Sequence, residues 1–214
     1  MATLTKNPVA ELNPRGRGRP RDEEARARIL QAALDMLEET CFANATADAI
    51  AERAGASKAT IYRWWPNKEA VFIEALREAT AQELPFPDTG NLDEDLHRQL
   101  HNFVKLLTGR WGRKFKKFIA AAQSDPSVAE AFRTLWIEPR RAQAKAVLEK
   151  HQAEGRLSKE TDLEVFIDAL YGPFYFRLLA GHRPLTPTLA EEIANMALRS
   201  VRQNGQPSPA SPIG

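Results

Sequence analysis

The chain is poor in cysteine and in long apolar stretches, and both shortages exclude classes of protein. Cys41 is the single cysteine among 214 residues, so no intrachain disulfide can form, which fits a reducing compartment. We expect Cys41 to be a small buried apolar side chain and not a redox sensor. No run of about 18 or more apolar residues occurs, and the polar N-terminus lacks the apolar core of a secretory signal. The sequence therefore predicts a cytoplasmic protein with no membrane partner.

Residues that would support catalysis are also scarce. No nucleophile–base pair, metal cluster or glycine-rich phosphate loop is recognisable, so no cofactor is predicted. His97 and His101 are spaced i and i+4 on a predicted helix and could hold a metal. No third ligand lies near them in the sequence, and a polar helix face is the expected interpretation. An enzyme or carrier with an α-helical small-molecule pocket is an alternative that no motif supports.

The net charge is only +2, but the basic residues are concentrated in two segments. Residues 1–21 carry a net charge of +4, and residues 53–68 carry +4 with no acidic residue. The basic residues of the two segments are Lys6, Arg15, Arg17, Arg19 and Arg21, then Arg53, Lys58, Arg63 and Lys68. Local basic patches on a nearly neutral protein favour site-directed DNA binding over indiscriminate binding.

The spacing of apolar residues is helical along the chain, and no stretch alternates in polarity as a strand would. Two short helices are expected at about 46–53 and 57–63, capped by Thr46 and Ser57. Gly55 lies between them, where a tight turn needs a positive φ. Other helices are expected from Asp22, from Asn67, along a stripe from Leu92, at about 112–123, over a long segment interrupted by Pro139, at 160–180 and at 187–203. The sequence predicts an all-α fold of about nine helices.

Composition divides the chain into four parts. Residues 1–20 are interpreted as a flexible basic arm and 205–214 as a disordered tail, because both lack an apolar period. A break with the sequence LPFPDTG, starting at Leu84, separates a helix-turn-helix domain at 21–83 from a larger helical domain at 84–204. Segment 160–180 is apolar on two sides, with Leu163, Ile167, Leu170, Phe174 and Leu178 on one and Tyr171, Tyr175 and Leu179 on the other. Two apolar sides predict burial against a second copy of the chain.

The segment 46–68, TADAIAERAGASKATIYRWWPNK, is the most informative. Ala49, Ile50 and Ala54 can pack the first short helix, and Ile61 and Trp65 can pack the second. The residues left near the exposed side are Lys58, Thr60, Tyr62, Arg63 and Trp64. A short helix lifted on a small bundle, with donors at its N-terminal end, has the geometry that enters a major groove of DNA.

These residues follow the pattern T-x-x-x-I-A-x-x-A-G-x-S-x-x-T-I-Y-x-x-(W/F)-x-x-K-E, which closely resembles the DNA-binding domain of the tetracycline-repressor (TetR) family. The resemblance covers about residues 25–76. The segments WIEPRRAQ and YGPFYFRLL are similar to one common subgroup of that family. The resemblance implies a homodimer of two-domain subunits, in which the last two helices form a four-helix interface. It also implies a ligand cavity in the second domain.

Carried over position by position, the resemblance assigns DNA contacts to the short helices. Thr46, Thr60, Tyr62, Trp64 and Lys68 would contact phosphates, and the backbone amides at Thr46 and Ser57 could do so too. Lys58, Ala59 and Arg63 would lie closest to base edges. Arg63 could pair with guanine O6 and N7, which discriminates by about 1–3 kcal/mol. Trp64 departs from the tyrosine, histidine or phenylalanine of many relatives, and its bulk alters that contact.

The arm contains Arg15-Gly16-Arg17-Gly18-Arg19-Pro20-Arg21, which resembles the core of an AT-hook. Narrow A·T minor grooves concentrate negative potential and attract arginine. We therefore hypothesise that Arg17 and Arg19 enter the minor groove beside the recognition helix. A solvated tail is the alternative interpretation.

Aromatic residues of the second domain are the candidates for lining an effector cavity. They are Trp111, Phe115, Phe118, Trp136, Phe166, Tyr171, Phe174 and Tyr175, of which we expect most to be core and about a third to touch ligand. Arg177 is a possible anchor for an acidic effector. Pro139 and Pro173 fall inside helical patterns, where we expect a kink or a break. A sharper hypothesis is that such kinks open the cavity and leave carbonyl acceptors free.

Together these features predict a sequence-specific, effector-responsive transcriptional regulator that is associated with the nucleoid. The simplest form is a repressor that binds a pseudo-palindromic double-stranded operator as a homodimer and is released by a small molecule. The homodimer would form through the helices near 160–180 and 187–203. Activation, and an architectural role on A·T-rich DNA, are the alternatives.

Overall fold

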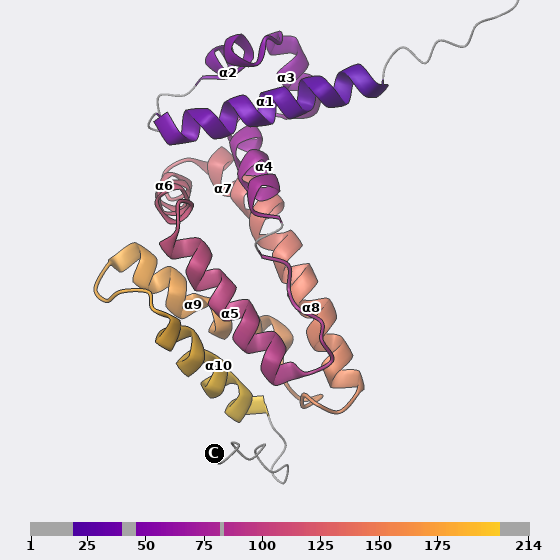
Figure 1. Ribbon diagram of the computed structural model, residues 1–214, viewed down its shortest axis with the longest axis vertical. Helices are drawn as coiled ribbons and strands as arrows, with labels where there is room; N and C mark the ends of the chain where they lie inside the picture. The colour runs from indigo at the N-terminus through magenta and orange to yellow at the C-terminus, as the bar shows by residue number, and fades with distance from the viewer. Residues whose placement is uncertain (1–18, 40–45, 82–83, 202–214) are drawn as a thin grey trace, which may run out of the picture.

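The computed structural model describes residues 19–39, 46–81 and 84–201, and all of its regular structure is helical (Figure 1). The helices are α1 (Arg19–Glu39), α2 (Ala47–Ala54), α3 (Lys58–Trp64), α4 (Lys68–Thr80), α5 (Leu92–Thr108), α6 (Gly112–Ala122), α7 (Pro126–Phe132), α8 (Glu138–Ala153), α9 (Leu163–Ala180) and α10 (Pro187–Val201). A π-helical turn, η2 (Arg133–Ile137), joins α7 to α8 without a break. The described residues therefore form nine continuous helical segments, and the predicted all-α fold is confirmed.

Helices α1 to α4 form one end of the molecule, with α2 and α3 farthest from α9 and α10 (Figure 1). Ile29, Ala33 and Leu37 bury one face of α1 against α2 and α4. The predicted start of this helix at Asp22 is slightly late, because α1 begins at Arg19. A proline in the first turn is compatible with a helix, since the amides of that turn have no intrahelical acceptor, and Pro20 is such a residue.

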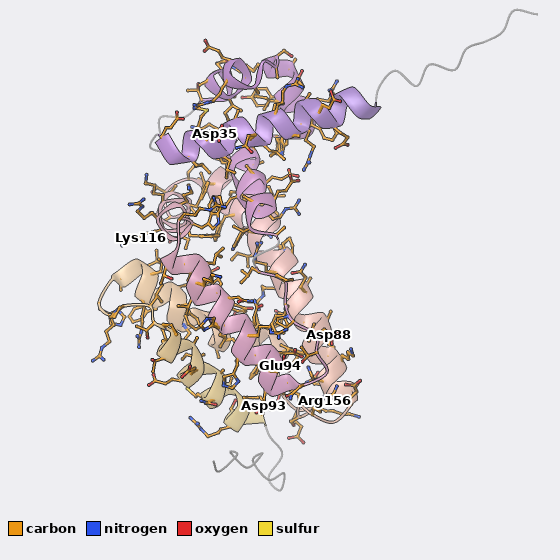
Figure 2. All side chains as sticks on the ribbon, viewed as in Figure 1. Asp35, Asp88, Asp93, Glu94, Lys116 and Arg156 are labelled. Atoms are coloured by element: carbon orange, nitrogen blue, oxygen red, sulfur yellow. The ribbon has the colours of Figure 1, made fainter. Side chains whose placement is uncertain are left out.

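The larger part of the molecule is built around α5. Helix α5 packs on α9 and α10, and Leu96, Leu100 and Phe103 carry its apolar stripe. Residues 84–91, which precede α5, are not helical, and the exposed ion pair of Asp88 with Lys150, at 2.9 Å, ties this segment to α8. Figure 2 shows Asp88 at the end of the molecule far from α2 and α3. None of the helices in the described part is long and apolar enough to cross a membrane.

Pro139 does not interrupt the long helix, contrary to the sequence prediction. It lies in the first turn of α8, directly after the π-helical turn, where the amide of Glu138 donates to the carbonyl of Arg133. The wider π-helical turn places the proline where a missing N–H is tolerated. Pro173 likewise lies inside α9 without ending it.

Helix α9 is apolar on two sides, as predicted, but the second side differs from the expected one. Tyr171 and Tyr175 face inward and pack edge-on against Phe103, with ring centroids 5.0 and 5.6 Å from it. The outward stripe consists of Val165, Ala169, Gly172, Phe176 and Leu179. The difference arises because the ring of Phe103 on α5 also covers Tyr171 and Tyr175, so the buried face of α9 is wider than a single stripe.

Candidate nucleic-acid interface and effector cavity

The turn between α2 and α3 is fixed by its capping residues. The Thr46 hydroxyl accepts from the amide of Ala49 at 3.1 Å, and the Ser57 hydroxyl accepts from the amide of Thr60 at 3.1 Å. Gly55 ends α2 in the left-handed conformation, with φ +59°, as the sequence predicted. These contacts set the angle at which α3 leaves the bundle.

The inner face of the two helices holds α3 in place. Ile50 and Ile61 have no exposed surface, and Trp65 is 3% exposed. The Trp65 indole N–H donates to Glu74 on α4, so the end of α3 is pinned to the next helix. The Arg28 guanidinium donates to the carbonyl of Ala54 at 3.2 Å and ties α1 to the end of α2. Helix α3 is therefore presented by a rigid support.

The outer face of α3 carries the side chains that the sequence singled out for DNA contact. Lys58, Ala59, Tyr62, Arg63 and Trp64 are exposed, and Thr60 is half-buried. Lys58 forms an exposed ion pair with Asp48 at 2.9 Å, which is screened by solvent and leaves the amine available for another partner. Lys68 is half-buried at the start of α4, with Nζ 3.8 Å from the Glu69 carboxylate.

The arginine-rich arm is only partly described. Arg17 lies outside the described residues, as does Cys41, and Arg19 is the first residue of α1. The predicted minor-groove contacts of Arg17 and Arg19 therefore stay predictions.

A small cavity of about 60 Å³ lies between α5, the π-helical turn, the start of α8 and α9. We call it the inner cavity. Its lining residues are Leu84, Gln99, Phe103, Trp136, Ile137, Arg140, Arg141, Ile167, Tyr171 and Tyr175. Trp136, Tyr171 and Tyr175 are among the aromatic residues that the sequence proposed for an effector cavity.

The remaining proposed lining residues lie elsewhere. Trp111, Phe115, Phe118, Phe166 and Phe174 are buried and absent from the inner cavity wall. Phe115 packs edge-on against Trp136, with ring centroids 4.3 Å apart, and so supports the wall from behind. These five side chains are core residues.

Arg177 does not reach the inner cavity either. Its guanidinium donates to the carbonyl of Pro184 at 3.0 Å, in the loop after α9. It lies in the last turn of that helix, where the helix dipole favours a cation. Two arginines that the sequence did not single out, Arg140 and Arg141, line the inner cavity instead.

Arg140 extends from the first turn of α8 across the ring of Trp136, with Cζ 3.2 Å from the ring centroid. Its Nη2 donates to the Thr80 hydroxyl of α4 at 3.2 Å, and its buried Nε has no hydrogen-bond partner. Burial, with a smaller contribution from the neighbouring Arg77, lowers the pKa of Arg140 to about 10. The guanidinium nevertheless carries its charge at neutral pH.

A second opening, the outer cleft, adjoins the inner cavity. It has a volume of about 240 Å³ and is lined from α4, the segment after it and the start of α8. Leu84 and Arg140 line both spaces, so these two side chains separate them. The outer cleft is also lined by Arg77, which pairs with Glu74 at 3.5 Å, and by the carboxylate of Glu78.

The two halves of this architecture match two family profiles. A profile described as "Bacterial regulatory proteins, tetR family" matches residues 29–75, and one described as "Tetracyclin repressor-like, C-terminal domain" matches residues 86–197. The chain belongs to the TetR family. It is thus a helix-turn-helix transcriptional regulator and not an enzyme.

Relatives within the TetR family align over most of the chain. The regulator YdeS of Bacillus subtilis (strain 168) is 42% identical over 186 residues, which cover 87% of this chain and 94% of that protein. The crystal structure of the TetR family regulator SCO0332 is 34% identical, with a TM-score of 0.74 over 84% of this chain and 100% of the other. The flavonoid-responsive regulator FrrA is 26% identical, with a TM-score of 0.62 over 83% and 95% of the two chains.

The histidine pair considered in the sequence is part of a polar surface in this TetR family member. The ring Nδ1 of His97 lies 2.7 Å from the carbonyl of Asp93, and His101 is exposed. Within residues 19–39, 46–81 and 84–201, no group of three or more His, Cys, Asp or Glu side chains is placed to hold a metal ion.

Proposed function

We propose that the protein is a sequence-specific repressor that binds a pseudo-palindromic operator in the cytoplasm as a homodimer and is released by a small-molecule effector. The observation that carries the proposal is the outer face of α3, where Lys58, Tyr62 and Arg63 project from a short helix whose inner face is fully buried. A rigidly supported helix with exposed cationic and phenolic donors fits a major groove.

The proposed DNA contacts fall into two classes, contacts to base edges and contacts to phosphates. Arg63, in the last turn of α3, is the candidate for bidentate pairing with guanine. Lys58 and Ala59, at the N-terminal end of the same helix, are the other candidates for base contacts. Thr46, Thr60, Tyr62, Trp64 and Lys68 are the candidates for phosphate contacts, together with the backbone at Ser57. Phosphate contacts fix the position of the helix, whereas Arg63 supplies sequence discrimination.

The outward stripe of α9 supports a homodimer. Val165 and Phe176 are each 64% exposed, and Leu179 is 42% exposed. On the neighbouring α10, Met196 is 46% exposed. A contiguous apolar stripe of this kind is rare on a monomer and suits an isologous interface, in which the same helices of two copies pack on each other.

The inner cavity and the outer cleft support effector control. The outer cleft lies between α4 and the start of α8, and the inner cavity adjoins it within the larger domain. Helix α4 follows α3 directly in the chain (Figure 1). An occupant that prefers one position of α4 would change the spacing of the two recognition helices. The relative FrrA is named flavonoid-responsive, which supports a small-molecule effector for this chain as well.

The test is selection of bound duplexes from a random DNA pool at near-physiological salt. We expect a palindromic site with half-sites about one helical turn apart, roughly 34–36 Å, or somewhat farther. R63A should relax specificity at one base pair of each half-site by about 1–3 kcal/mol.

The matched control is R98A, because Arg98 is an exposed arginine on α5, paired with Glu94 at 3.0 Å and remote from α3. R98A should select the same site as the unmodified chain. Enrichment of A·T-rich DNA without a palindrome would favour the architectural alternative. No enrichment at all would favour a helical carrier.

A further inference from the structure

Arg140 differs from the other arginine that lines the inner cavity. Arg141 is neutralised, because its guanidinium forms ion pairs with Glu164 and Asp168. Among the described residues, no carboxylate forms an ion pair with Arg140, and the cation of Arg77 is close enough to lower its pKa. A partly buried cation without a counterion is costly, since desolvation is not offset by pairing. The site therefore has an unmet requirement for an anion.

The inner cavity also holds a buried hydrogen-bond acceptor that has no donor. Gln99 Nε2 donates to the Tyr171 hydroxyl at 2.8 Å, but Gln99 Oε1 is buried without a partner. A buried acceptor of this kind requires a hydrogen-bond donor. Arg140 and Gln99 share the wall of the inner cavity with Phe103, Trp136 and Tyr175. The wall thus combines a cation, aromatic rings and a free acceptor.

Resting on the proposed function, we propose that the effector is an organic anion, an apolar or aromatic carboxylate with a hydroxyl or N–H donor at its other end. Arg140 binds the carboxylate, the aromatic wall encloses the apolar body, and Gln99 Oε1 accepts from the distal donor. The carboxylate supplies the missing counterion and accepts from Arg140 Nε, which has a free N–H.

The volumes indicate the route of entry. The inner cavity alone, about 60 Å³, has room for only about two water molecules. Together with the outer cleft of about 240 Å³, the space reaches the lower end of the range for small-molecule sites, about 300 Å³. Movement of Leu84 and Arg140 joins the two. The ligand therefore enters by the outer cleft, and Arg140 moves when it binds.

The experiment is calorimetric titration of the full-length protein, without DNA, with matched acids and amides. The pairs are benzoate and benzamide, 4-hydroxybenzoate and 4-hydroxybenzamide, 4-hydroxyphenylacetate and its amide, and indole-3-acetate and its amide. We expect at least one acid to bind about tenfold to a hundredfold more tightly than its amide. The proposal is overturned if no acid binds up to about 10 mM, or if amides bind as tightly as acids.

Variants assign the effect to the named side chains. R140Q should abolish the preference for the acid, R140K should retain part of it, and R98Q, the control at an exposed arginine that lines neither space, should leave it unchanged. Q99L should remove the advantage of 4-hydroxybenzoate over benzoate while keeping the acid preference. Equal acid preference in R140Q and in the unmodified chain would overturn the role of Arg140, and R140K answers the same question if R140Q fails to fold.

Release of operator DNA is measured separately, so the two proposals can fail independently. An acid that binds through Arg140 without releasing DNA supports the ligand class and contradicts effector-driven release. A neutral compound that releases DNA equally well from R140Q supports release and overturns the ligand class.

Discussion

The guanidinium of Arg140 donates to the hydroxyl of Thr80 at 3.2 Å and so joins the first turn of α8 to the last turn of α4. Thr80 is fully buried, and its own hydroxyl donates to the carbonyl of Leu76 at 2.9 Å. Three residues separate the end of α3 from the start of α4. In the proposed mechanism, a displacement of Arg140 at the cavity would be transmitted along α4 to α3.

Replacing Thr80 by valine should uncouple ligand binding from DNA release. T80V keeps the shape of the side chain but removes the acceptor of Arg140, so the free energy of unfolding should fall by about 1 kcal/mol. An acid that binds the unmodified chain should bind T80V comparably. The factor by which the acid weakens operator binding should be about fivefold or more smaller in T80V than in the unmodified chain. Calorimetry and operator titration with and without the acid measure the two quantities.

The matched control for T80V is T108V. The Thr108 hydroxyl also donates to a carbonyl one turn back, that of Val104 at 2.8 Å, at the end of a helix, α5. This threonine is exposed, so T108V should respond to the acid as the unmodified chain does. Full acid-driven release in T80V would contradict the link through Thr80.

Placing a charge on the outward stripe of α9 should dissociate the dimer. Phe176 is 64% exposed in one chain, so F176E should change the stability of the folded subunit little, by about 0.5 kcal/mol or less. In the dimer the two carboxylates would be buried, and the dimer Kd should rise about a hundredfold or more. Sedimentation equilibrium gives the Kd, and operator affinity should fall with it.

A charge placed elsewhere on the surface serves as the control for F176E. Ala146 is exposed on α8, away from the α9 stripe, and A146E adds the same charge. The A146E variant should remain dimeric. Dissociation of both variants alike would indicate a general effect of charge, and a dimeric F176E would place the interface on another surface.

The arginine-rich arm should contribute to DNA binding in a salt-dependent way. Each cation that neutralises a phosphate contributes about −0.9 to the slope of log K against log salt, so R15Q/R17Q should flatten that slope by up to about two per protomer. The measurement is operator affinity at several salt concentrations, and K6Q serves as the control because Lys6 lies outside the Arg-Gly-Arg-Pro motif. An unchanged slope in R15Q/R17Q would support the interpretation of the arm as a solvated tail.

Much of the fold follows from local sequence signals. The caps at Thr46, Ser57 and Asn67 and the positive φ of Gly55 are local requirements, and the structure has each of them. Pro139 could not be interpreted in this way, because the π-helical turn that accommodates it depends on packing around Trp136. Local signals predict where helices begin better than how they continue.

The candidate effector site was predicted only in part. The signal that could have found the rest is a polar residue within an otherwise apolar helix stripe. Gln99 falls within the α5 stripe that runs from Leu96 to Phe103, and Arg140 lies four residues from both Trp136 and Ala144 on the buried face of α8. A polar residue at such a position must find a partner. The sequence alone shows these positions, but only the fold shows that Gln99 and Arg140 face the same cavity.

The same stripes carry a second polar pair, which should be structural. Asp95 on α5 and His151 on α8 are fully buried, with Oδ2 and Nε2 3.0 Å apart. Asp95 Oδ1 also accepts from the amide and the hydroxyl of Thr89, at 2.9 and 2.7 Å. The opposite ring nitrogen of His151 accepts from Arg156 Nε at 2.9 Å. Unlike Arg140, each of these groups has its partner within the chain.

Removing Asp95 should therefore destabilise the protein without altering what its DNA-binding end recognises. D95A strands the donors of His151 and Thr89, so the free energy of unfolding should fall by about 3 kcal/mol, whereas D95N, which keeps an acceptor, should lose less. D88A is the matched control, because the Asp88–Lys150 pair is exposed and contributes about 1 kcal/mol or less. Urea unfolding measures the free energy of unfolding of all three variants.

Asp88 and Arg156 lie at the end of the molecule far from α3 (Figure 2), so folded D95A should select the same operator as the unmodified chain. A loss in D95A no larger than in D88A would mean that the buried network contributes no more than a surface pair.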